Sequence, residues 1–236
     1  MKRLPRIALV LMAGLLTFGG LQLAPTAAQD NTLVMARAVD ATGLDPQTQT
    51  AFASLRLLEL IYEPLVTVNE NLEVVPALAE SWEFSEDGTQ LTFHLREGVT
   101  FHDGSDLTSA DVIASFERIL DEATGASTRT NLLSITSMEA PDDNTVVLNL
   151  SLPDVPLLTA LATTNAAILS SDVIASGDPT TDAIGTGPFK LDNWTPDQTT
   201  NLSANSEWWA GAPAIDGIEM RIIPDESTIM AALRAG

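Results

Sequence analysis

The sequence predicts a mixed α/β (α+β) protein made of open sheets with hairpins. Two hairpin patterns and one amphipathic helix carry this prediction. Apolar and polar residues alternate on both sides of Glu86-Asp87-Gly88, a turn sequence that strongly favours a β-hairpin. The same alternation flanks residues 141–144, which read Pro-Asp-Asp-Asn. Between the two hairpins, apolar residues from Val112 to Leu120 recur at the spacing of one helix face.

The other elements follow in chain order from the same two periodicities. Near the N-terminus we expect a strand over residues 32–38 and a helix over 51–62, with Phe52 and Tyr62 on its apolar stripe. Thr108 with Asp111 three residues later forms a capping box, which sets the start of the helix over 112–120. The elements expected after the second hairpin are a helix over 153–162 capped by Asp154, strands over 166–169 and 218–223, and a helix over 227–235. The run 185–191 is expected to enter a further strand through a glycine-rich bend.

The first 28 residues have the layout of a secretory signal peptide. A basic start precedes an uncharged apolar run over residues 7–18, and small residues follow up to Ala28. This run is too short for a membrane-spanning helix, which needs about 20 apolar residues. We therefore expect cleavage near Ala28 and export to the periplasm. The sequence has no cysteine, so neither a disulfide nor a lipid anchor is expected.

The exported chain is expected to be strongly acidic. The sequence has 11 basic and 32 acidic residues, a formal net charge of −21, and removal of three basic signal residues makes this −24. Such a charge repels phosphates and anionic lipids, so no nucleic-acid partner is expected. Hydrophobic residues make up 45% of the chain, which argues against disorder.

Motifs of common enzyme and cofactor sites are absent from the sequence. It has no Gly-x-Ser-x-Gly elbow, phosphate loop or His-Glu-x-x-His pattern. The two histidines, His94 and His102, are expected to be solvated or capping side chains, because a metal site needs more converging ligands. Gly185-Thr186-Gly187 is interpreted as a backbone crossing between subdomains, not a nucleotide loop. The Trp208-Trp209 pair is open to three interpretations: a sugar platform, core aromatics or cleft-edge aromatics. No metal and no cofactor is expected.

Four stretches together resemble the peptide/nickel-type (family 5) solute-binding proteins of ABC importers. The most specific one runs from residue 76 to 104 and contains PALAESW and LREGVTFHDG. The others are Leu44-Asp45-Pro46, residues 61–65 (IYEPL) and residues 183–189 (AIGTGPF), and the ending over 224–236 is also similar. The resemblance covers nearly all of the chain after the signal, in the family's order and spacing.

The resemblance implies a two-lobe cleft protein of the type II periplasmic-binding class. Residues 29–50 and 184–236 would form subdomain Ia of the first lobe, and residues 51–183 would form subdomain Ib. Members of the family are about twice this long, well beyond one ordinary domain. The second lobe is therefore expected after Gly236, and the chain is expected to be a truncation.

The resemblance also implies a function without bond chemistry. The expected protein is a monomer that captures di- or oligopeptides by hinge closure and delivers them to the permease subunits of an ABC importer. In the family the loop after Leu-Asp-Pro lines the cleft, which nominates Gln49, Thr50, Ala51 and Phe52 for ligand binding. Phe52 would be an apolar wall or, alternatively, the first core residue of its helix. Other open alternatives are a non-peptide ligand (nickel chelate, haem, opine or oligosaccharide), a secreted hydrolase, and a receptor module without transport.

Overall fold

The computed structural model describes residues 31–176 and 178–235. The signal peptide interpreted over residues 1–28 lies outside the described residues, so it stays a prediction. Among the helices of the described part of the chain, none is both long enough and apolar enough to span a bilayer.

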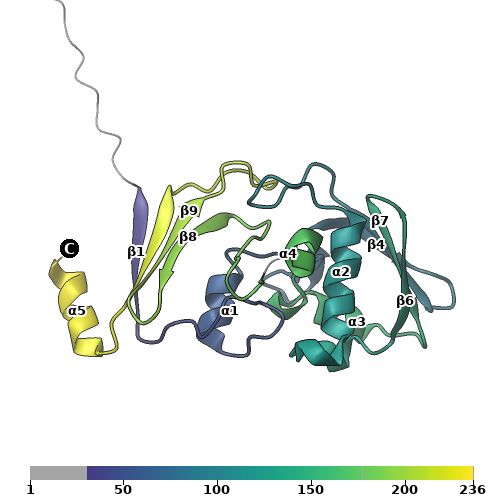
Figure 1. The fold of residues 1–236 in the computed structure, drawn as a ribbon, viewed down its shortest axis with the longest axis horizontal. Helices are drawn as coiled ribbons and strands as arrows, with labels where there is room; N and C mark the ends of the chain where they lie inside the picture. The colour runs from purple at the N-terminus through teal and green to yellow at the C-terminus, as the bar shows by residue number, and fades with distance from the viewer. Residues whose placement is uncertain (1–30, 177, 236) are drawn as a thin grey trace, which may run out of the picture. The chain divides into compact units, whose positions relative to one another are not determined.

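One four-stranded sheet, called sheet A here, contains the first and the last strands of the described chain (Figure 1). Its strand order is β1-β10-β9-β8; β1 and β10 pair in parallel and the other pairs are antiparallel. A parallel pair needs a long crossover, and here residues 38–216 lie in sequence between the two strands. The strands are β1 Thr32–Arg37, β8 Phe189–Thr195, β9 Thr199–Ala204 and β10 Gly217–Ile222.

The second four-stranded sheet, sheet C, consists of the two predicted hairpins. Its order is β4-β5-β7-β6, and all pairs are antiparallel. Gly88 in the first turn has a φ of 70°, the left-handed conformation that a glycine adopts without steric cost. The strands are β4 Ala79–Phe84, β5 Gln90–Leu95, β6 Ile135–Asp142 and β7 Thr145–Leu150; a small hairpin of β2 Val66–Val68 and β3 Val74–Pro76 precedes them.

The helix α2 begins at the predicted capping box and packs along β6 and β7 (Figure 1). The Asp111 carboxylate accepts hydrogen bonds from the Thr108 backbone N–H at 2.8 Å and from its hydroxyl at 2.9 Å. The α-helices are α1 Phe52–Leu58, α2 Ser109–Leu120, α3 Pro156–Leu161, α4 Ser171–Ser176 and α5 Glu226–Ala235; the short 3₁₀ helices are η1 Glu122–Thr124, η2 Arg129–Asn131 and η3 Thr164–Ala166.

Buried apolar side chains form two clusters. The first packs sheet C against α2, with Phe93 and Phe116 fully buried. The second packs sheet A against α1, with Leu57 and Ile61 fully buried. The segment 184–189 runs from one to the other, because its first residue packs on the first cluster and its last residue belongs to the second.

The predicted helix over 51–62 is shorter than expected and ends at Leu58. Its continuation is used otherwise: the carbonyl oxygens of Leu60 and Ile61 accept hydrogen bonds from the backbone N–H groups of Phe189 and Gly187, at 3.0 and 2.9 Å. Both residues fall in the last turn of the predicted helix, whose carbonyls have no partner within the helix, and the contact with the bend satisfies them. The run 185–191 enters a strand through a glycine-rich bend, as predicted: β8 begins at Phe189, and the preceding residues form the bend that contacts these carbonyls.

Two further predictions between β7 and α4 are wrong. Residues 166–169 form no strand: Ala166 ends η3, and the buried residues after it are held by separate hydrogen bonds, among them Ile168 N–H to the Glu63 carbonyl and Leu169 N–H to the Ser115 hydroxyl. The helix predicted over 153–162 is α3, and its N-cap is Val155, not Asp154. Asp154 contributes to the start of α3 through its backbone: its carbonyl accepts a hydrogen bond from the Leu157 N–H at 3.3 Å.

Candidate functional site

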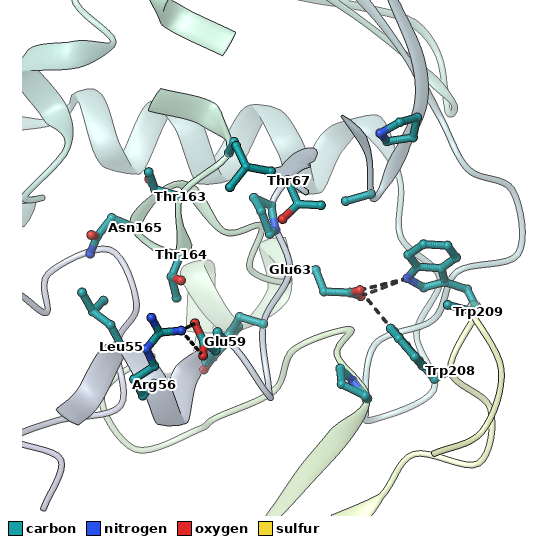
Figure 2. A pocket seen from close by; sticks show the side chains of 18 of the residues that line it. Leu55, Arg56, Glu59, Glu63, Thr67, Thr163, Thr164, Asn165, Trp208 and Trp209 are labelled. Carbon is teal, nitrogen blue, oxygen red and sulfur yellow. Dashed lines mark hydrogen bonds and ion pairs between the residues drawn. The ribbon is translucent and has the colours of Figure 1, made fainter. Parts of the chain in front are cut away.

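A pocket of about 740 Å³ opens between segments that are far apart in sequence (Figure 2). Its walls come from α1, the β2–β3 hairpin, the loop before and through η3, and the residues after β9. Figure 2 shows Leu55, Arg56 and Glu59 on one side, Trp208 and Trp209 on the other, and Glu63 between them. We call these the α1 end and the tryptophan end.

The four nominated ligand residues do not share one environment. Phe52 lines the pocket and is 70% exposed, so the alternative that it is a core residue is wrong. Ala51 is the half-buried N-cap of α1, and Thr50 before it is exposed. The Gln49 side chain turns back along its own loop and accepts a hydrogen bond from the Thr42 hydroxyl at 2.8 Å. Ligand contact by the four residues remains a prediction.

The loop that carries these residues is held firmly against the rest of the fold. Asp45 of Leu-Asp-Pro is 1% exposed and forms an ion pair of 2.5 Å with Arg118 of α2. The Asn165 side chain donates to the backbone carbonyls of Pro46 and Gln49, at 2.7 and 2.8 Å. Because Asn165 also lines the pocket, the loop and the η3 wall form one connected surface.

At the α1 end the charged side chains of Arg56 and Glu59 form an ion pair with each other. The Arg56 guanidinium lies 4.8 Å from the centre of the Phe52 ring and 2.8 Å from the Glu59 carboxylate. Both charged side chains are exposed, so their mutual attraction contributes little to stability. They are therefore available to rearrange around a ligand.

At the tryptophan end a buried carboxylate organises the wall. Glu63 is 9% exposed and accepts hydrogen bonds from the indole N–H groups of Trp208 at 3.2 Å and Trp209 at 3.0 Å, and from the Thr186 hydroxyl at 2.9 Å. Burial raises the pKa of Glu63, while these hydrogen bonds and the nearby Arg96 charge act in the opposite direction.

The two indole rings are pocket-lining aromatics, tilted by 59° with centroids 5.7 Å apart. The Arg96 guanidinium lies over the Trp209 ring at 4.1 Å from its centroid, a cation–π arrangement. The Trp209 ring is thus held by two residues: Glu63 accepts a hydrogen bond from its N–H group, and Arg96 packs on one face of the ring. Reasoning from the sequence missed Glu63 as a site residue, although the IYEPL motif contained it.

The bend formed by Gly185, Thr186 and Gly187, called the glycine bend here, packs against the backbone of Leu60 and Ile61, which follow α1. A Cβ atom at Gly185 would overlap the carbonyl oxygen of Ile61, and one at Gly187 would lie 2.7 Å from the Ile61 carbonyl carbon. Such distances are sterically forbidden, so both positions need glycine. The interpretation as a close backbone crossing agrees with this geometry.

His102 contacts the other side of the bend. Its side chain is half-buried and its ring bonds to backbone groups of the bend, so the expectation of a solvated histidine is wrong, whereas a capping role fits. Its backbone N–H donates to the Gly185 carbonyl at 2.8 Å, and its ring Nε2 lies 2.9 Å from the Gly187 carbonyl. The Gly185 N–H faces ring Nδ1 at 3.4 Å. A carbonyl only accepts and an N–H only donates, so the neutral ring protonated at Nε2 fits both contacts. Burial lowers the pKa of His102, consistent with that neutral form.

Groups of three or more His, Cys, Asp or Glu side chains placed to hold a metal ion are absent from residues 31–176 and 178–235.

Comparison with solved structures identifies the class of fold. The structure of the periplasmic binding protein DppA from Helicobacter pylori in complex with the peptide STSA superimposes with a TM-score of 0.79 at 34% identity, over 87% of this chain and 45% of that one. The structure of AgaA from A. tumefaciens R10 in complex with agropinic acid gives a TM-score of 0.81 at 36% identity, over 87% and 42%. The fold is that of a periplasmic binding protein, which confirms the predicted fold class.

Sequence comparison then gives the family. Residues 73–236 match the model of the bacterial extracellular solute-binding proteins, family 5 (Middle), and the chain belongs to this family. It is 34% identical to the dipeptide-binding protein of Escherichia coli K12, over 94% of this chain and 47% of that protein. The chain spans between 33% and 47% of the curated relatives it matches. The resemblance inferred from the motifs is thereby confirmed.

Proposed function

We propose that the protein to which this chain belongs is the extracytoplasmic solute-binding component of an ABC importer and that its ligands are di- or oligopeptides. The observation that carries the proposal is the family membership, together with a similarity to a dipeptide-binding protein that extends over 94% of the chain. The 740 Å³ pocket, exposed and built from four segments, would be one wall of the ligand cleft. Ligand would bridge this wall and a second lobe and thereby favour the closed state, which the permease would recognise.

The finer parts of the proposal follow from the sequence. The first 28 residues would direct export and be removed, and the mature protein would act in the periplasm as a monomer without catalysing a reaction. Subdomain Ia would comprise residues 29–50 and 184–236, and subdomain Ib residues 51–183. Peptide main-chain groups would be bound by polar atoms and ordered water, which allows broad selectivity.

A non-peptide ligand is a second candidate, because one specific observation favours it. The AgaA structure, which contains agropinic acid, is 36% identical to this chain. Mass spectrometry of the small molecules that co-purify with the full-length protein would decide between the two ligand classes.

The nominated loop gives the test of the site. In the full-length protein, Thr50→Arg should weaken peptide binding roughly tenfold or more without shifting the melting midpoint, because it places a large charged group beside Phe52 in an exposed position. Thr136→Arg on β6 is the matched control: Thr136 is also exposed and does not line the pocket. An unchanged dissociation constant for Thr50→Arg in calorimetry would exclude the loop from the site.

A further inference from the structure

The tryptophan end of the pocket differs chemically from the α1 end. The indole N–H groups of Trp208 and Trp209 both donate to the Glu63 carboxylate, so the rings offer the pocket carbon surface and no free donor. The neighbouring lining residues include Pro64, Pro188 and Ala77, which have no polar side-chain atoms. Both tryptophans are only partly buried, so part of each ring surface is accessible from the pocket.

The charges at this end are already compensated within the protein. Both oxygens of Glu63 accept hydrogen bonds, one set from the two indoles and one from Trp209 and Thr186. Arg96 provides the cation of the arrangement: it lies over the Trp209 ring and donates to the Ala77 carbonyl at 3.3 Å. A ligand cation would be attracted by Glu63 but repelled by Arg96, and a ligand anion would experience the reverse, so the two residues together favour neither charge. An uncharged group avoids the cost of desolvating a charge at this end.

We infer that Trp208 and Trp209, held in place by Glu63, form a subsite that accepts an uncharged apolar or aromatic side chain of the bound peptide. The inference rests on the proposed peptide-binding function and adds the chemical class of side chain that one part of the pocket selects. Aromatic rings that meet in tilted or offset arrangements contribute beyond the area they bury. Glu63 is a positioning residue here, because it acts on the ligand through the two rings.

The test compares three peptides on the full-length protein by calorimetry: Ala-Ala-Ala, Ala-Phe-Ala and Ala-Lys-Ala. The wild type should bind Ala-Phe-Ala roughly tenfold more tightly than Ala-Ala-Ala, as burial of a large apolar side chain predicts. Trp209→Ala should abolish this preference, measured as the ratio of the Ala-Phe-Ala and Ala-Ala-Ala affinities within the same variant. Glu63→Gln should reduce the same preference, because an amide places a donor against one of the indole N–H groups.

Trp194→Ala is the matched control. Trp194 lies on β8, donates its indole N–H to Asp40 and does not line this pocket, so its loss should leave the peptide preference unchanged. If Trp209→Ala fails to fold, Trp209→Leu replaces it, which keeps an apolar side chain and removes the ring.

The outcomes separate the inference from the proposed function. A Phe-over-Ala preference that survives in Trp209→Ala and Glu63→Gln overturns the subsite and leaves peptide binding intact. A selective loss of Ala-Lys-Ala binding in Trp209→Ala also overturns it, because the rings would then hold a cation. Failure of all three peptides to bind the wild type overturns both.

Discussion

Two buried titratable side chains, Glu63 and His102, flank the same glycine bend. Thr186 in the bend donates to Glu63, and the two glycines beside it contact His102. Burial raises the pKa of Glu63 and lowers the pKa of His102, because in each case burial disfavours the charged form. The bend is thus sensitive to pH from both sides, in opposite directions.

For His102 the sign of the effect on stability can be worked out. Its pKa in the folded protein lies below the ordinary 6.5, so below pH 6.5 the unfolded chain binds more protons than the folded one. The stabilisation is therefore complete above pH 6.5 and is lost as the pH falls. Lys190, which donates to the His102 carbonyl at 3.2 Å, also disfavours a charged ring.

We therefore predict that the loss of unfolding free energy between pH 7.5 and pH 5.5, measured by urea denaturation, is smaller in His102→Gln than in the wild type. The raised pKa of Glu63 acts equally in both proteins and cancels in the comparison. His94→Gln, which removes a histidine on β5 away from the bend, is the control variant. Identical pH dependence of His102→Gln and wild type would contradict the assignment.

The roles of these two residues could not be predicted from the sequence. The partners of Glu63 lie 123 to 146 positions away, and those of His102 lie 83 to 88 positions away. Neither periodicity nor a local motif reports such distances. Phe52 shows the converse: the family motif pointed to it, although helical spacing alone favoured burial.

At the scale of elements, strong local signals gave correct results and weak ones did not. The Asp-Gly turn of the β4–β5 hairpin and the capping box of α2 depend on neighbouring residues only, and both are found. The missed strand β9 reads TTNLSA, mostly polar, and it is a strand because it lies between β8 and β10. The helix predicted over 51–62 ends at Leu58, and the residues after it contact the glycine bend, which local sequence does not reveal.

The glycine bend itself gives a prediction of stability. Gly187→Ala should lower the unfolding free energy by about 3 kcal/mol, because its Cβ atom would press on backbone atoms of Leu60 and Ile61 that cannot move aside. Gly98→Ala is the comparison: it has open space around it but a φ of 72°, so it should cost about 1 kcal/mol. Urea denaturation measures both. A smaller loss for Gly187→Ala than for Gly98→Ala would contradict the close crossing.

At the scale of the whole molecule, the pocket is open to solvent at its α1 end. Phe52, Arg56 and Glu59 remain exposed, and tight ligand sites normally bury most of the ligand surface. The chain also spans less than half of its curated relatives. Sequence reasoning could predict the family and the kind of fold at this scale. It could not predict the ligand, because the residues that line the pocket come from segments far apart in the chain.

We predict that residues 29–236 expressed alone bind no di- or tripeptide with a dissociation constant below about 100 μM, because one wall leaves most of the ligand in water. Calorimetry with the peptides used above provides the measurement, and circular dichroism verifies that the fragment is folded. Micromolar binding by the fragment would mean that the pocket is complete within these residues.

The segment 184–189, which connects the two apolar clusters, affects how the described part of the chain unfolds. Its backbone is bonded on one side to Leu60 and Ile61, beside the second apolar cluster, and on the other to His102, beside the first. Separating residues 184–189 from either cluster therefore breaks backbone hydrogen bonds that also hold this segment in place against the other cluster. Two interiors joined in this way should melt as one cooperative unit, despite having separate cores.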